Sequence, residues 1–304
     1  NKATQVLNKI RKDTNEVTNP LKPINPAKDV TVKVGGASAN GKSIYKGRSF
    51  LYQLDSSILP ANRAYPQVDK WDIVDSLDPA FDEYTGQWAV YATRDLLSDG
   101  EALASKGDRI AGSGFDSSKL GGDLFTLSAA TVDGRNVVTI EATDRYRALV
   151  SDDSHEAGWR AYIQCKRLAV TDRHENQFTE HYNDKTLGSN VVWTRTPDMT
   201  PSIDVQKWDR KSGWPNGDRD NSKDALTVSG DTEIVFTITN TSKTDPDTKQ
   251  GAVFRTKDIK LEDSTIVGDG EVVDLKYPAD WDTKVLKPGE SVEVTGTLKG
   301  VTKT

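Results

Sequence analysis

An all-β fold in two tandem sandwich domains is predicted by three features of this sequence. Valine and threonine are abundant, and both favour strands over helices. Short runs that alternate apolar and polar residues recur along the chain, whereas long stretches with helical periodicity are few. A length of 304 residues is too great for one ordinary sandwich and suits two domains.

The composition excludes several classes of partner. The net charge is −6, with no basic stripe and no apolar segment of membrane length, so we expect a monomer without nucleic acid or membrane contacts. Cys165 is the single cysteine, which excludes an intrachain disulfide. Because the sequence starts at Asn1 without a methionine or signal peptide, we expect it to be a piece of a longer protein.

Proline-rich joints divide the chain. Residues 1–24 are polar and predict a linker or the tail of a preceding domain, with a short helix over 3–12 and a short strand over 14–20. A second joint at 196–201 separates a domain at 25–199 from a smaller immunoglobulin-like domain at 200–304, whose last strand could lie beyond Thr304.

Strand patterns recur in both domains. Residues 95–133 are rich in Gly, Ser and Asp and predict a long loop region with short strands, and 144–151 predict one or two helical turns. The predicted strands are 30–34, 50–54, 71–77, 87–92, 137–142, 159–170 and 189–194 in the first domain, and 203–207, 232–240, 259–261, 272–275 and 291–298 in the second.

Three polar residues of the first domain share a strand face with apolar neighbours. Lys28 is in phase with Val30, Val32 and Val34, so it should point into the core. Asp75 is in phase with Trp71, Ile73 and Leu77, and Asn190 shares a face with Val192. A lysine, a carboxyl and a carboxamide are therefore predicted inside one sandwich.

Those three groups together permit an intramolecular isopeptide bond. Burial lowers the pKa of a lysine and leaves a neutral amine nucleophile. Burial raises the pKa of a carboxyl, so Asp75 can polarise the Asn190 carboxamide and shuttle protons while ammonia leaves. The alternative is a set of strand-edge residues, with Lys28 extending to water and Asn190 in a turn.

Four segments resemble the C-terminal domains of antigen I/II surface adhesins, which are wall-anchored proteins of Gram-positive bacteria. They are residues 25–31 (NPAKDVT), 84–92 (YTGQWAVYA), 159–170 (WRAYIQCKRLAV) and 189–197 (SNVVWTRTP). The resemblance covers about residues 20–198 and departs in the glycine-rich 95–133 region and at Cys165.

This resemblance implies a variant immunoglobulin fold with a Lys28–Asn190 isopeptide bond. Asp75 matches the assisting carboxyl, with Asp72 and Asp78 as the alternatives. The segment around Asn15 is similar to the end of a preceding domain's last strand, which would make Asn15 the partner of a lysine outside this chain. A plain linker asparagine is the equal alternative.

Residues 200–304 resemble the tandem immunoglobulin-like stalk repeats of Gram-positive surface proteins, through short motifs at 205–208, 236–242 and 286–291. Lys207 lies in the first strand of this domain, but no bond is predicted for it. We therefore expect a rigid, non-enzymatic stalk fragment of a secreted, cell-wall-anchored adhesin, whose full-length form binds a host or bacterial surface protein or glycan.

Other candidate sites are weaker. Asp218, Asp220, Asn221 and Asp224 space oxygen ligands as a calcium loop does, but without the glycine and glutamate of an EF-hand, so a solvated turn is favoured and no cofactor is expected beyond that calcium.

The remaining candidates are aromatic, histidine and thiol groups. Trp208 and Trp214 could form a carbohydrate-stacking surface or pack between domains. Cys165 is expected to be a buried structural thiol, and His155, His174 and His181 lack metal-ligand spacing. The rival function is a binding module that uses loops 95–133 or 209–224.

Overall fold

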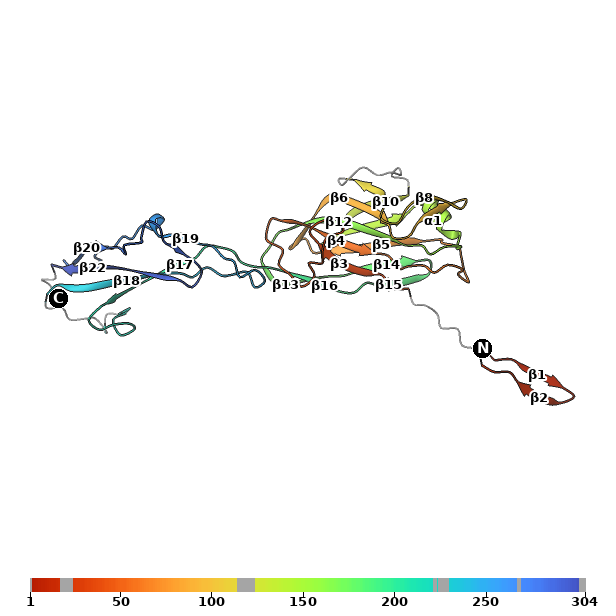
Figure 1. The fold of residues 1–304 in the computed structure, drawn as a ribbon, viewed down its shortest axis with the longest axis horizontal. Helices are drawn as coiled ribbons and strands as arrows, with labels where there is room; N and C mark the ends of the chain where they lie inside the picture. Colours follow the sequence, from red (N-terminus) through yellow and green to blue (C-terminus); the bar gives the residue numbers. More distant parts are fainter. Residues whose placement is uncertain are drawn as a thin grey trace. The chain divides into compact units, whose positions relative to one another are not determined.

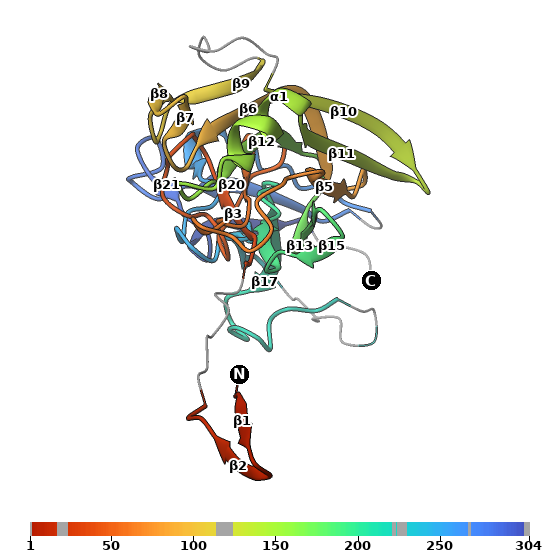
Figure 2. The same cartoon turned by 90° about the vertical axis from the view of Figure 1, so that its right-hand side faces the viewer.

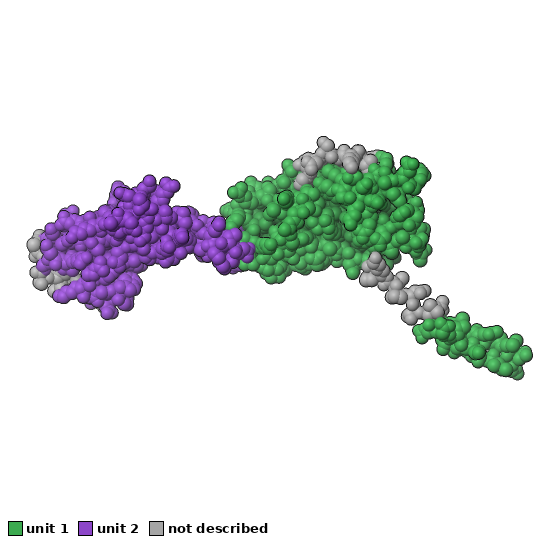
Figure 3. Space-filling view, in the orientation of Figure 1, with its two compact units in different colours: residues 1–169, 173–195 green, residues 170–172, 196–304 purple. Residues whose placement is uncertain are grey.

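The all-β prediction is confirmed. The computed structural model describes residues 2–16, 24–113, 124–220, 223, 230–266 and 269–300. It divides into two compact units, Asn1–Ala169 with Arg173–Arg195, and Val170–Asp172 with Thr196–Thr304 (Figure 3). The main boundary between these units falls at residues 195–196, and the predicted boundary between the domains 25–199 and 200–304 falls at 199–200.

The chain begins with a β-hairpin, so the helix predicted over 3–12 is wrong. Strands β1 (Thr4–Leu7) and β2 (Ile10–Asp13) pair antiparallel. Between them Asn8 and Lys9 have φ of 49° and 68°, the positive values that a two-residue hairpin turn requires. Local turn chemistry therefore outweighs the weak helical pattern of the predicted segment.

The strand predicted over 14–20 is not formed at residues 14–16, and the rest of it lies outside the described residues. Asn15 is exposed, and its carbonyl accepts the Thr14 hydroxyl at 3.1 Å. Its predicted bond to an external lysine stays a prediction.

Two five-stranded sheets form the body of the first unit (Figure 1). One has the order β10 (Phe125–Val132), β11 (Arg135–Ala142), β5 (Trp71–Leu77), β14 (Phe178–Tyr182), β15 (Lys185–Gly188). The other has the order β3 (Ala27–Thr31), β4 (Ser49–Asp55), β12 (Trp159–Arg167), β6 (Asp82–Ala92), β9 (Arg109–Ser113).

Smaller elements complete this unit. Figure 2 shows β10 and β11 paired along their length. The other elements are the pair β7 (Leu96–Ser98) and β8 (Glu101–Ala104), helix α1 (Asp144–Ser151), and the pair β13 (Thr171–Asn176) and β16 (Val192–Thr196).

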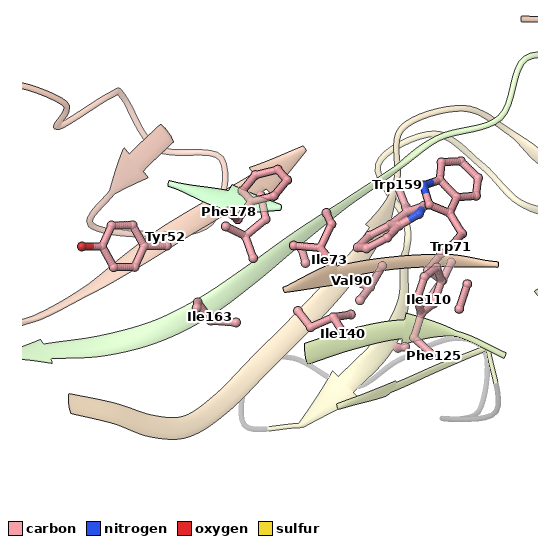
Figure 4. Close-up of a cluster of buried hydrophobic side chains, with 14 of the residues drawn as sticks. Tyr52, Trp71, Ile73, Val90, Ile110, Phe125, Ile140, Trp159, Ile163 and Phe178 are labelled. Atoms are coloured by element: carbon pink, nitrogen blue, oxygen red, sulfur yellow. The ribbon is translucent and has the colours of Figure 1, made fainter. Parts of the chain in front are cut away.

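Inward-facing aromatic and branched side chains fill the core between these sheets (Figure 4). Trp71 and Trp159 are fully buried, with ring centroids 6.0 Å apart in an edge-to-face contact. Phe125 packs 4.9 Å from Trp159, and Tyr52 and Phe178 belong to the same cluster. Burial of each such side chain stabilises the fold by roughly 1.5–3 kcal/mol.

Several predicted boundaries in this unit need correction. Strand β3 ends at Thr31, and Val32 is 65% exposed because the chain turns away through Gly35 at φ 64°. The described part of the predicted loop region at 95–133 contains four strands, β7, β8, β9 and β10, and its residues 114–123 lie outside the described residues. Strands β13 to β15 were not predicted, because their polar outer faces hid the alternation.

A four-stranded sheet forms most of the second unit. Its order is β17 (Ile203–Asp209), β18 (Thr232–Asn240), β22 (Ser291–Lys299), β20 (Glu271–Lys276), and β19 (Phe254–Arg255) pairs with β21 (Val285–Leu286). Ile234, Phe236 and Ile238 face its core, as predicted. Within the described ranges, no helix has the length and apolar character to cross a membrane.

The strand predicted at 259–261 is wrong. A 3₁₀ turn, η2 (Thr256–Asp258), stands before it, and the Ile259 amide closes on the Thr256 carbonyl at 3.0 Å. The Thr256 hydroxyl donates to the Lys284 carbonyl at 3.0 Å, which holds the turn in place.

Candidate functional site

Lys28 points into the core of the first unit. Strand β3 places it opposite Leu54 of β4, and its side chain is 0% exposed. Its ammonium forms an ion pair with Asp75, whose side chain is also 0% exposed. Asp75 lies in the middle of β5, so the pair joins one sheet of the sandwich to the other.

Aromatic rings surround the Lys28 ammonium. Its nitrogen lies 4.3 Å from the centroid of the Tyr52 ring and 5.7 Å from that of Phe178. Figure 4 shows Tyr52 and Phe178 among the buried side chains of this core. The Tyr52 hydroxyl donates to Asp82 at 2.7 Å, which fixes the ring beside the amine.

Burial works against both charges of this pair. It lowers the pKa of Lys28, although the nearby Asp75 carboxylate opposes that shift. It raises the pKa of Asp75, and the Lys28 charge opposes that shift in turn. A proton can therefore move from the ammonium to the carboxylate, which leaves a neutral amine beside a neutral acid.

A third group, the Asn176 carboxamide, completes the cluster. Asn176 ends β13, two residues before Phe178, and Phe178 lies directly opposite Asp75 in the β14–β5 pair. It is 7% exposed, and a side-chain contact with it lowers the pKa of Asp75.

Among the described residues, only the oxygen of the Asn176 carboxamide has a hydrogen-bond partner. Asn176 Oδ1 accepts the Gln177 amide at 2.7 Å. Asn176 Nδ2 and Asp75 Oδ1 are both buried and have no hydrogen-bond partner in the part of the chain that the structure describes, although a side-chain interaction with Asn176 lowers the pKa of Asp75. The Asp75 carboxyl thus neighbours both the amine and the carboxamide.

Asn190 lies next to Lys28, but against its main chain. Asn190 Oδ1 accepts the Lys28 amide at 2.8 Å, and Asn190 Nδ2 donates to the Lys28 carbonyl at 2.9 Å. The residue is exposed and precedes β16 instead of lying within it. The structure therefore brings Lys28 and Asp75 together as expected, with Asn176 in the place predicted for Asn190.

Alternation could have revealed Asn176. His174, Asn176 and Phe178 are buried, whereas Glu175 and Gln177 between them are exposed. The period of two runs through a segment rich in charged residues, which resembled a loop.

The two alternative carboxyls have other partners. Asp72 accepts a hydrogen bond from His181 Nδ1 at 2.6 Å and pairs with Lys70 at 3.3 Å. Asp78 accepts the Ala80 amide at 3.0 Å and lies 3.4 Å from Arg135. Both carboxyls bind partners other than Lys28, so Asp75 is the carboxyl in position.

A second buried polar network lies beside the cluster. Asp82 pairs with Arg167 at 3.1 Å and accepts hydrogen bonds from Tyr52 and His174. Cys165 is a fully buried free thiol, and burial raises its pKa, which keeps it protonated and unreactive.

The second unit has an exposed counterpart of the lysine pair. Lys207 Nζ lies 2.7 Å from Asp263 and 5.6 Å from the centroid of the Phe236 ring. The two charged side chains are 47% and 17% exposed.

The calcium prediction gains no support among the described residues. Asn221 and Asp224 lie outside them, and no three His, Cys, Asp or Glu side chains in the described part of the chain could hold a metal ion. Asp218 has its pKa raised by burial and by the neighbouring Asp220 charge.

An aromatic groove of about 700 Å³ also lies on this unit. Trp208 is one of its lining residues, is 7% exposed, and donates through Nε1 to the Thr237 hydroxyl at 2.9 Å. Trp214 is 56% exposed, and its ring centroid is 6.5 Å from that of Trp208.

Comparisons with known proteins agree on one family. The family model described as cell surface antigen C-terminus matches residues 25–197. The aggregation substance of Enterococcus faecalis is 34% identical over 190 residues, which cover 61% of this chain and 13% of that protein. The chain therefore spans a small part of that relative.

Two solved structures resemble the chain. The C-terminal domain of the Streptococcus pyogenes antigen I/II-family protein AspA has a TM-score of 0.53 and 27% identity, over 64% of this chain and 52% of that one. The C-terminal domain of the Streptococcus agalactiae polypeptide BspA has a TM-score of 0.52 and 24% identity, over 64% and 56%. The second likeness concerns the fold alone.

Proposed function

The chain belongs to the cell surface antigen C-terminus family, and on that premise we propose that it is a stalk segment of a wall-anchored adhesin, stiffened by a Lys28–Asn176 isopeptide bond. The observation that supports this proposal is the meeting of an amine, a carboxyl and a carboxamide in one dry core. We expect no catalytic turnover, because each chain would react only once and only with itself.

The proposed reaction begins with proton transfer from the Lys28 ammonium to Asp75. The neutral amine then attacks Cγ of Asn176, and negative charge develops on Oδ1, which the Gln177 amide already contacts at 2.7 Å. Asp75 gives its proton to the departing Nδ2 and takes one from the attacking nitrogen. One C–N bond forms, one breaks, and ammonia leaves.

Asn176 fits this reaction better than Asn190 does. The attacked carbon must lie beside the amine and away from water, so that the amine stays neutral. Asn176 is buried and contacts Asp75, whereas Asn190 is exposed and binds the main chain of Lys28.

The proposed bond would tie the two sheets of the first unit together. It would close a loop of about 150 residues, which by analogy with a disulfide is worth about 5 kcal/mol through the unfolded state. Under tension, β3 could not separate from the segment that leads into β14 without breaking a covalent bond. That is the property a stalk under force requires.

Intact mass and peptide mapping of the purified chain test this proposal. We expect the wild-type chain to be one ammonia lighter than its sequence, with the linked peptides containing Lys28 and Asn176. Lys28→Ala and Asn176→Ala should each have the full mass. A wild-type chain of full mass would exclude the bond. A peptide map that joins Lys28 to Asn190 would mean that Asn190, the partner predicted from the sequence, is the residue that reacts.

A second candidate function, recognition of a surface protein or glycan, is supported by the aromatic groove. Exposed Trp214 offers an apolar face to a sugar ring, and Thr237, Thr239 and Asp218 border the same groove with hydroxyl and carboxylate groups. Screening the chain and Trp214→Ala against immobilised glycans tests this function. Equal binding by both would exclude it.

A further inference from the structure

The dipeptide Ser189–Asn190 touches both of the strands that would react. On one side, the Asn190 carboxamide makes two hydrogen bonds, of 2.8 and 2.9 Å, with the amide and carbonyl of Lys28. Together they act as one rung of a β-ladder on the outer edge of β3, the end strand of its sheet. They fix the backbone from which the reactive lysine side chain departs.

On the other side, Ser189 binds the segment that follows Asn176. Its amide donates to the Phe178 carbonyl at 3.0 Å, and its hydroxyl accepts the Phe178 amide at 3.1 Å. The Gln177 side chain also donates to the Ser189 carbonyl. Ser189 is 5% exposed, so these contacts are shielded from water.

We propose that Ser189–Asn190 is a positioning strap that holds the Lys28 strand and the Asn176 segment at the separation that bond formation needs. This inference rests on the proposed isopeptide bond. Strand β3 and strand β14 belong to different sheets, so no ladder between them sets their spacing. The strap spans that gap with hydrogen bonds at both ends.

The strap affects rate and not chemistry. A nucleophile and a carbonyl carbon react quickly only when they are held near contact, and a misplacement of about 1 Å costs on the order of 100-fold. Asn190 donates no proton to the reaction and takes none, because its carboxamide faces the Lys28 main chain. It is therefore a positioning residue.

The test follows ammonia loss over time in the full chain, which is isolated unfolded in denaturant before the bond can form, diluted into native buffer and sampled for intact mass. Asn190→Ala should form the same product as the wild type at a rate lower by roughly tenfold or more. Asn40→Ala is the matched control, because exposed Asn40 also accepts a main-chain amide, that of Trp193, at 2.9 Å. It should react at the wild-type rate.

Asn190→Asp separates positioning from general loss of stability. Its carboxylate keeps the acceptor for the Lys28 amide but repels the Lys28 carbonyl until it is protonated, near a pH of about 4. Its rate relative to that of Asn190→Ala should therefore rise on acidification. Tryptophan fluorescence shows whether each variant is folded. If Asn190→Ala does not fold, Ser189→Ala replaces it, because it removes the hydroxyl that accepts the Phe178 amide at the other end of the strap.

The outcomes are distinct. A wild-type chain that never loses ammonia would overturn the isopeptide bond itself. A wild-type chain that loses it, with folded Asn190→Ala reacting equally fast, would overturn the strap and leave the bond standing. A cross-link mapped to Asn190 would also overturn the strap, because Asn190 would then be a reactant.

Discussion

The two units each have a lysine on their first sheet strand, beside an aromatic ring and paired with an aspartate. In the first unit Lys28 and Asp75 are both 0% exposed. In the second, Lys207 and Asp263 are 47% and 17% exposed. The residue types are the same, so the difference between the sites is their access to water.

Access to water decides what such a pair can do. An exposed ammonium and carboxylate keep their charges, because water solvates both, and attract each other weakly. A buried pair loses that solvation, and its pKa values move towards each other, as those of Lys28 and Asp75 do. In the proposed mechanism burial is therefore what makes Lys28 a nucleophile, whereas Lys207 is exposed to water.

The largest effect is expected for Asp75→Ala. This variant loses the proton shuttle, so the isopeptide bond should not form, and it leaves the Lys28 amine buried without a partner. Removing one member of a buried pair costs about 3–5 kcal/mol beyond the loss of the cross-link. Urea unfolding and intact mass measure both consequences.

The companion variant Lys28→Met with Asp75→Ala restores an apolar core without a cross-link. It should recover most of the cost of the unpaired amine while its mass shows no ammonia loss. Equal stability of the single and double variants would contradict the buried-pair explanation.

A smaller loss is expected for Asn176→Ala, which removes the cross-link but keeps the Lys28–Asp75 pair. Its free energy of unfolding should fall by about 5 kcal/mol, the value of closing a loop of this length. Differential scanning calorimetry would show the loss as a lower Tm for the transition of the first unit. If the Tm is unchanged and the wild-type chain has lost no ammonia, side-chain packing without a cross-link accounts for the stability of this unit.

The rate of bond formation should depend on pH from both sides. The reactive pair holds one proton between Lys28 and Asp75, so a second proton at low pH and loss of the shared proton at high pH both stop the reaction. The lowered pKa of Lys28 and the raised pKa of Asp75 narrow the window inside their ordinary values of 10.5 and 3.8. Ammonia release measured from pH 3.8 to 10.5 should be bell-shaped, and a flat profile would contradict the mechanism.

The same shifts set the pH dependence of stability in unlinked Asn176→Ala. Between the lowered folded pKa of Lys28 and 10.5, the unfolded chain holds more protons on Lys28 than the folded chain does, so the lysine contribution to stability rises with pH over that interval. Above 3.8 the folded chain holds more protons on Asp75, so its contribution is present at low pH and is lost as the pH rises through the folded pKa.

Strand phase predicted the buried positions of Lys28 and Asp75. Asp75 lies between buried Ile73 and Leu77 on one strand face, whereas Lys28 shares its face with buried Val30 although Val32, used in the same argument, is exposed. It failed for the carboxamide. Asn190 stands just before β16, where side chains no longer alternate strictly between the faces of a sheet, while Asn176 sits in a charged segment whose alternation is hard to see.

Contacts between distant segments explain the other failures. The pairing of Asn190 with the Lys28 main chain joins residues 162 positions apart, and no local pattern reports such a contact. The opening hairpin depends on positive φ at Asn8 and Lys9. Neither residue is a glycine, the residue type that adopts positive φ most readily, so the sequence did not indicate this turn. The sequence predicted which side chains of a strand face the core, whereas the positions where strands end depend on the tertiary structure.

The smallest effect is expected at the exposed pair. Lys207→Ala should change the free energy of unfolding of the second unit by less than about 1 kcal/mol, because exposed ion pairs contribute little. Its intact mass should be lower only by the substitution, with the same ammonia loss as the wild-type chain. A stability loss as large as that of Asn176→Ala would mean that partial exposure is enough to make Lys207 structural, and the contrast between the two lysines would then not follow from burial.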